Sequence, residues 1–334
     1  MIQIDQIKKN IDNWNFFFKI KSLIKDNENH EKTYENFKNT LKVNYTSVYI
    51  QILAPILILI SIIYFSSLKT KSEVIFVNFV NFVIISLLIG MIFHNIQNIV
   101  HAGIHHNLHK NKRISDIISN ILGIFTASEI SEVRKIHSKH HTLVGTYEDP
   151  ESSYLHPLTI KKIIFYFLGI AMIKYAINYT NQSSDIIEKN FFKKIKKFVT
   201  FHRALSLIFH LLCLTIFFFY LNNLIILFAW IYAFFAFLPF FNSLQNIMEH
   251  GEIKEIQNTN YYKVRAINRN FKSDFFSKYI YGNFGSNKHA LHHWDPTIHY
   301  LCLDEVYNFL KKSNIKEAIT MRDDSYLKIL RKIF

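Results

Sequence analysis

Four long stretches of this 334-residue chain are apolar and contain no charged side chain. Each approaches the roughly 17–25 residues that a helix needs to cross the hydrocarbon core of a bilayer. Because ordinary soluble domains rarely contain such stretches, they constrain the fold more than any other feature. The sequence therefore predicts an all-α integral membrane protein with spanning helices over about residues 47–66, 74–93, 204–220 and 224–241.

Two further apolar segments do not fit a full span. Residues 117–127 are about half the required length, and residues 157–180 include Lys161, Lys162 and Lys174. Segments of this kind are typical of re-entrant helices or of helices that lie on the membrane surface.

The distribution of positive charge predicts the orientation of the spans. Residues 1–46 contain eight lysines and six acidic residues, which is unlike a cleaved signal peptide. The turn between the first two spans holds two lysines, and the turn between the last two holds none. By the positive-inside tendency, both termini and the central segment face the cytoplasm, and the spans form two hairpins. The basic residues just before the third span are Lys193, Lys194, Lys196, Lys197 and Arg203.

We therefore expect two regions: a cytoplasmic N-terminal segment, 1–46, and a membrane domain, 47–334, whose cytoplasmic C-terminal part covers 251–334. The net charge of +14 does not indicate nucleic-acid binding, because no aromatic and basic recognition motif is present. The only cysteines, Cys213 and Cys302, exclude a disulfide framework and a cysteine-ligated cluster.

Nine of the seventeen histidines lie in three short motifs, which we call the first, second and third boxes. Imidazole nitrogens are typical ligands of iron, copper, zinc or nickel. Helical spacing places residues three and four apart on one face, so each box directs several rings the same way. The boxes are HAGIHH (His101, His105, His106), HSKHH (His137, His140, His141) and HALHH (His289, His292, His293).

The predicted topology brings the boxes to one side of the membrane, because an even number of spans separates them. Nine nitrogen donors are more than one ion can bind, so the sequence favours two metals. A tenth candidate ligand, His250, lies where the fourth span ends, and Asn246 precedes it by one helical turn. Glu249, beside it, is a candidate partner that orients a ligand ring.

Three other residues are weaker candidates for partners that contact the ligand side chains. Asp149 follows the second box and Asp295 follows the third. His94 lies seven residues before His101, on nearly the same helix face. We expect each to orient a ligand or stabilise a turn rather than to bind metal.

The three boxes in this membrane context resemble the membrane fatty acid desaturase superfamily, the histidine-box di-iron desaturases and hydroxylases. The chain is similar to the family pattern HxxxHH, HxxHH and HxxHH over roughly residues 47–300. Asp149-Pro150 resembles the Asp-Pro that follows the family's second box, and the element 246–250 resembles its additional ligand motif. The resemblance implies two iron ions, O2 as co-substrate and an acyl-lipid or acyl-CoA substrate. Because the chain has no flavin, haem or iron–sulfur motif, it also implies a separate electron donor such as a ferredoxin or cytochrome b5.

Alternatives remain open within this resemblance and outside it. Hydroxylases and ketolases of lipids or hydrocarbons use similar boxes, and Glu249-His250-Gly251 is similar to a motif of alkane hydroxylases. A non-catalytic metal-binding membrane protein or a metal transporter is a more distant alternative. Transporters usually place their ligands inside the spans, whereas these boxes lie at span ends and outside the membrane.

Overall fold

The computed structural model describes residues 34–68, 74–144, 149–151, 159–173, 200–250, 268–272, 274–312 and 323–333. The chain divides into two compact units. The span unit comprises Tyr45–His137 and Ser153–Gln245, and the terminal unit comprises Met1–Asn44, Ser138–Ser152 and Asn246–Phe334. The lysine-rich residues 1–33 and the basic residues Lys193 to Lys197 lie outside the described residues.

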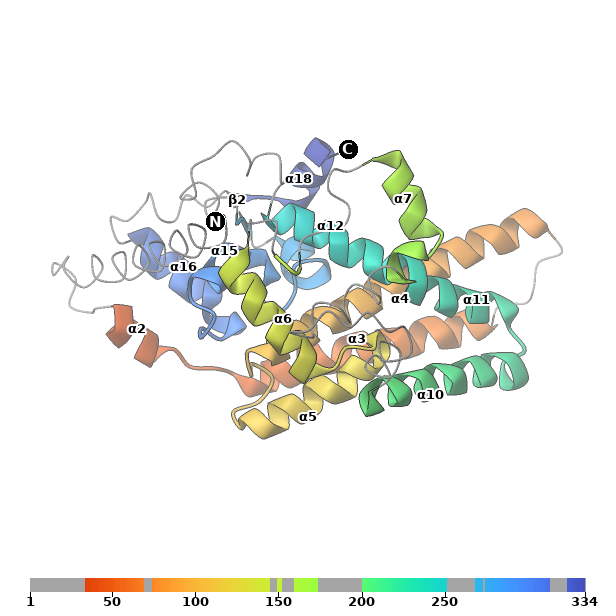
Figure 1. The fold of residues 1–334 in the computed structure, drawn as a ribbon, viewed down its shortest axis with the longest axis horizontal. Coiled ribbons are helices and arrows are strands. Elements are labelled where there is room, and N and C mark those ends of the chain that lie inside the picture. Colours follow the sequence, from red (N-terminus) through yellow and green to blue (C-terminus); the bar gives the residue numbers. More distant parts are fainter. Residues whose placement is uncertain are drawn as a thin grey trace, which may run out of the picture. The chain divides into compact units, whose positions relative to one another are not determined.

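Within the described residues, four helices are long and apolar enough to cross a membrane, as the sequence predicts. Figure 1 shows α3, α4, α10 and α11 extending in a common direction. Two of these helices continue well beyond the predicted apolar stretches, because apolarity marks the lipid-facing length and not the end of the helix. The four are α3 (Tyr45–Leu68), α4 (Ile75–Ile104), α10 (Phe201–Thr215) with the π-helical segment η2 (Ile216–Tyr220), and Leu224–His250.

The fourth of these helices contains a π-helical segment within otherwise α-helical structure. It consists of α11 (Leu224–Tyr232), η3 (Ala233–Phe237) and α12 (Leu238–His250). Helix α4 packs against α3, α11 and η3. Phe93 of α4 meets Trp230 of α11 edge to face at 4.9 Å between ring centroids. The long helices are therefore held together by large apolar and aromatic side chains on their inner faces.

Shorter helices occupy the described residues between α4 and α10. Residues 117–127, predicted to be a re-entrant or surface-lying helix, form the end of α5 (Lys112–Gly123) and the short 3-10 helix η1 (Ile124–Thr126). The second box lies on α6 (Ile130–Leu143). Of residues 157–180, the described part includes α7 (Ile160–Phe167).

The described part of the terminal unit consists of short helices and one two-stranded parallel pair, a small departure from the all-α expectation. Its strands are joined in the register Asn270↔Asp323 and Phe271↔Asp324. The third box forms α15, which follows a tight turn at Gly285 with φ of 85°. The elements are α2 (Tyr34–Thr40), β1 (Asn270–Phe271), η4 (Phe276–Ile280), η5 (Ser286–Lys288), α15 (His289–Trp294), η6 (Tyr300–Cys302), α16 (Leu303–Lys312), β2 (Asp323–Asp324) and α18 (Tyr326–Ile333).

Gly285 suits the turn that leads into the third box for two reasons. Its positive φ is unfavourable for residues that carry a Cβ. An added Cβ would also lie 2.8 Å from Leu303 Cδ1 and 2.8 Å from Tyr300 Cβ. Two side chains then fix α15 on β1: the Lys288 ammonium donates to Phe271 O, and Asn270 Oδ1 accepts from Leu291 N–H.

Candidate metal-binding sites

Three histidines of the span unit gather where α4 ends and α6 passes. Ring nitrogens of His101, His105 and His137, the α4 triad, lie within 4.8 Å of one another. The ring centroids of His101 and His137 are 4.4 Å apart, and those of His105 and His137 are 5.1 Å apart. Burial, with His101 as the next cause, lowers the pKa of His105 to about 3. His105 is therefore neutral at pH 7, as a metal ligand must be.

The chain turns sharply directly after this triad. His106 N–H donates to Gly103 O, and Asn107 N–H donates to Ala102 O. This pair of hydrogen bonds is the Schellman arrangement that ends many helices, and it requires a left-handed residue at the position of His106. His106 has φ of 57°. The turn thus directs His106 away from His101 and His105.

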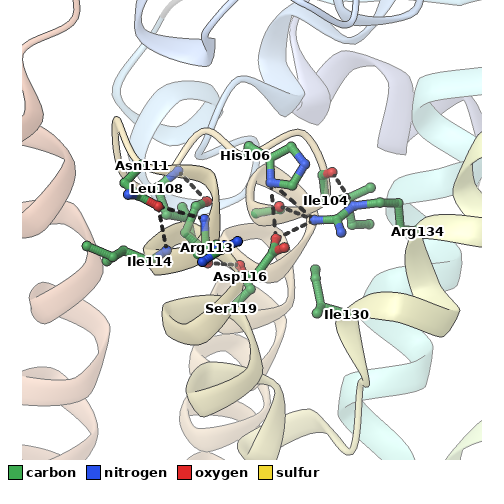
Figure 2. A network of polar contacts seen from close by, with 12 residues as sticks. Ile104, His106, Leu108, Asn111, Arg113, Ile114, Asp116, Ser119, Ile130 and Arg134 are labelled. Atoms are coloured by element: carbon green, nitrogen blue, oxygen red, sulfur yellow. Dashed lines mark hydrogen bonds and ion pairs between the residues drawn. The ribbon is translucent and has the colours of Figure 1, made fainter.

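Figure 2 shows where His106 points instead: to a polar network between α4, α5 and α6. Its Nδ1 lies 3.1 Å from the Asp116 carboxylate. The Arg134 guanidinium donates to Ile104 O through Nε at 2.9 Å, and through Nη2 to Gly103 O and to Asp116. One side chain of α6 therefore binds both the carbonyl end of α4 and the carboxylate of α5.

We expect His106→Gly to keep the metal of the α4 triad and to be more stable than His106→Ala by about 1 kcal/mol, because only glycine adopts the left-handed conformation without strain. Both variants lose the imidazole equally, so the comparison isolates the backbone. Iron content and thermal unfolding of the two purified variants measure these effects. Loss of half of the iron from both would instead support His106 as a ligand.

The terminal unit contains a second group of histidines. Ring nitrogens of His140, His250, His289 and His293, the four-histidine group, lie within 4.8 Å of one another. The Nε2 atom of His289 is 2.9 Å from His250 Nε2 and 3.0 Å from His293 Nε2. Lone pairs of neutral rings repel at such distances unless a proton or a cation lies between them. This convergence is the geometry expected around a shared metal ion.

In three rings of this group, Nδ1 lies against an oxygen acceptor. His140 Nδ1 lies 2.8 Å from the Asp149 carboxylate. His289 Nδ1 lies 3.3 Å from the Glu249 carboxylate. Acceptors on the outer nitrogen fix the tautomer and leave the other nitrogen's lone pair for a metal. The sequence-based prediction that Asp149 and Glu249 contact ligand rings is consistent with these distances.

The third acceptor, Asn268, was not predicted from the sequence. Its Oδ1 accepts from His250 Nδ1 at 2.7 Å. Glu151 was also missed: its carboxylate lies 3.9 Å from His140 Nε2. Glu151 follows Asp149-Pro150 directly, and that adjacency was the available signal. For Asn268, eighteen residues after His250, the sequence carries no comparable signal.

Two rings of the four-histidine group have pKa values shifted in opposite directions. Burial, followed by the neighbouring His141 and His289, lowers the pKa of His293 well below its usual value, so this ring is neutral. Burial alone would lower the pKa of His140 too, but Asp149 and Glu151 raise it to about 9. A metal ion at this position would displace the proton that the carboxylates favour.

Other predicted residues lie outside the two groups. His141 lies beside the four-histidine group, with its ring centroid 4.3 Å from that of His293 and 4.9 Å from that of His292. Asn246 lies on α12, four residues before His250.

Asp295 and His94 have well-defined partners elsewhere. Asp295 accepts from the Tyr34 hydroxyl at 3.0 Å and the Lys38 ammonium at 2.9 Å, so it joins α2 to the end of α15. His94 Nδ1 lies 2.8 Å from Asn242 Oδ1, a contact between α4 and α12. Both contacts stabilise packing between elements.

The donor sets fit a transition metal. Every member of the two groups is an imidazole, a ligand that suits iron, copper, zinc and nickel and not magnesium or calcium. The rings of the four-histidine group are buried or nearly so, and three have an oriented outer nitrogen. These features are those of a built metal site rather than of scattered surface histidines.

Comparison with protein families agrees with this chemistry. The model of the family described as fatty acid desaturase matches residues 78–324, which is 247 of the 334 residues. The match includes all three boxes, His250 and the acceptors Asp149, Glu249 and Asn268. The chain, which has two histidine groups and, in its described part, four helices long and apolar enough to cross a membrane, belongs to the fatty acid desaturase family.

Proposed function

We propose that this chain is a membrane-bound, O2-dependent desaturase that introduces a double bond into an acyl chain. The observation that supports this proposal most is the four-histidine group, whose rings converge on one point while oxygen acceptors hold their outer nitrogens. A methylene group of an acyl chain has no acidic proton and no leaving group, so acid–base chemistry alone cannot start the reaction. Bound iron would supply the activation of O2 and the removal of hydrogen.

The proposed ligands are nine of the ten histidines that the sequence indicates; His106 is left out because its ring meets Asp116 instead. Helix α6 contributes His137 to the α4 triad and His140 to the four-histidine group. Two separate groups of imidazoles, each able to hold an ion, support a count of two irons. The full proposed set is His101, His105, His137, His140, His141, His250, His289, His292 and His293.

The protein's own residues then have two tasks in the mechanism. Asp149, Asn268 and Glu249 meet Nδ1 of the three rings, which would leave Nε2 of each available to a metal. The surroundings of His293 lower its pKa and keep it neutral. The substrate, a lipid-linked or CoA-linked acyl chain, would enter from the bilayer along the apolar helices.

The proposal includes a topology and a partner. The four spans would form two hairpins, with both termini and the metal centre on the cytoplasmic side. Electrons would come from a separate protein such as a ferredoxin or cytochrome b5, because reducing O2 to water takes two electrons more than the acyl chain gives up, and these must be supplied again at each turnover.

The lipid profile of a host that expresses the chain tests the proposed reaction. We expect new unsaturated acyl chains by gas chromatography and mass spectrometry, compared with an empty-vector host. Added hydroxyl or keto groups would instead support the hydroxylase or ketolase alternative. Purified protein with stoichiometric zinc and no iron, together with unchanged lipids, would contradict both and favour a non-catalytic metal protein.

A further inference from the structure

A buried tyrosine of the C-terminal helix α18 contacts the carboxylate behind His289. The Tyr326 hydroxyl donates to Glu249 Oε1 at 3.0 Å. The other oxygen of the same carboxylate lies 3.3 Å from His289 Nδ1. Tyr326, Glu249 and His289 are 1%, 4% and 3% exposed, so water does not compete for these contacts. The three groups form a continuous chain of polar contacts that ends at the four-histidine group.

Two features fix Tyr326 in this position. Strand β2, just before it, pairs with β1, and the ring of Phe271 in β1 stacks on the Tyr326 ring at 3.6 Å and 7°. The Tyr281 ring packs against its side, with the ring centroids 5.2 Å apart. The tyrosine ring therefore sits in an aromatic slot, and the orientation of its hydroxyl follows from the position of the ring.

The direction of the hydrogen bonds follows from the protonation states. Burial, with the nearby charge of Glu249, raises the pKa of Tyr326 well above 10, so the hydroxyl stays protonated and donates the hydrogen bond. The hydroxyl is also 3.2 Å from Ser286 O, but the carboxylate is the nearer acceptor and carries charge. The Tyr326 hydroxyl occupies one oxygen of the Glu249 carboxylate, and the other oxygen faces His289 Nδ1.

We infer that Tyr326 is a positioning residue for the metal centre: through Glu249 it fixes the ring of His289, so that helix α18 completes the four-histidine group. This inference rests on the proposed function and deepens it. Tyr326 lies beyond residues 78–324, the part that the family model matches. A purely structural role would require only the ring, since phenylalanine would fill the same slot.

The test compares Tyr326→Phe with a matched packing variant on the same helix, Ile329→Val, whose parent side chain is also buried. Ferrous iron or Co²⁺ is titrated into the metal-free full-length protein, and the visible bands of Co²⁺ report the ligand environment. Tyr326→Phe should lose some thermal stability, because a buried carboxylate loses its donor, but it should also bind one of the two ions about tenfold more weakly, which is typical when a hydrogen-bond partner of a metal ligand is lost. Ile329→Val should be less stable and bind both ions as the wild type does.

Two results would overturn the inference alone: wild-type affinity and Co²⁺ bands in Tyr326→Phe, or equal loss of metal in both variants in proportion to their lost stability. A wild-type protein that binds neither iron nor Co²⁺ would overturn the proposed function itself and this inference with it. The two failures are therefore distinguishable.

Discussion

Replacing His140 by alanine is expected to reduce lipid product to below about 1% of the wild-type amount. Loss of a residue that hydrogen-bonds to a metal ligand typically costs 10- to 100-fold in metal affinity or activity, and loss of the ligand itself should cost more. His140 is buried, belongs to the four-histidine group and is held by Asp149. The measurement is the acyl-chain profile of the expressing host, together with iron per polypeptide in the purified variant.

The neighbouring exposed residue provides the control for His140. Lys139→Ala changes the same turn of α6 but removes no member of either histidine group, so product and iron should stay at the wild-type level. Both variants should accumulate in the membrane equally, because neither position lies in a spanning helix. A fully active His140→Ala variant would show that this group does not hold the reacting metal.

The sequence predicts the membrane helices and the clustering of the boxes because both depend on local patterns. Apolar runs identify the four spans, and spacings of three and four residues place histidines on one face of a helix. The structure has α4 continuing to Ile104, eleven residues beyond the predicted end at Phe93. The polar residues that follow Phe93 end the apolar run without ending the helix.

Contacts between residues far apart in the chain could not be predicted in the same way. Asn268 meets His250 across eighteen residues, and Tyr326 meets Glu249 across seventy-seven. Neither residue lies in a recognisable motif, and an asparagine or tyrosine occurs in many other roles. His106 shows a related difficulty: its place in the first box suggests a ligand, but its left-handed backbone directs it towards Asp116.

Arg134 is the residue whose replacement should most affect the α4 triad without removing a ligand. It lies one turn before His137 on α6 and binds carbonyl oxygens in the turn of α4 that carries His101 and His105. Arg134→Ala removes these bonds and leaves the Asp116 carboxylate without this partner. Since the side chains are about a third exposed, we expect a loss of stability of about 2 kcal/mol, below the sum of three charged hydrogen bonds.

Arg134→Lys separates the charge of Arg134 from its geometry. A lysine ammonium is a point charge and cannot reproduce the planar fork that reaches two carbonyls and a carboxylate together. We therefore expect Arg134→Lys to bind one iron roughly 10- to 100-fold more weakly, as Arg134→Ala does, because the two helices that carry the triad are no longer fixed together. Arg113→Ala, which removes an exposed arginine of α5, should match the wild type in thermal unfolding and iron titration. Wild-type iron affinity in Arg134→Lys would mean that positive charge alone suffices at this position, and that the forked contacts of the guanidinium do not hold the triad together.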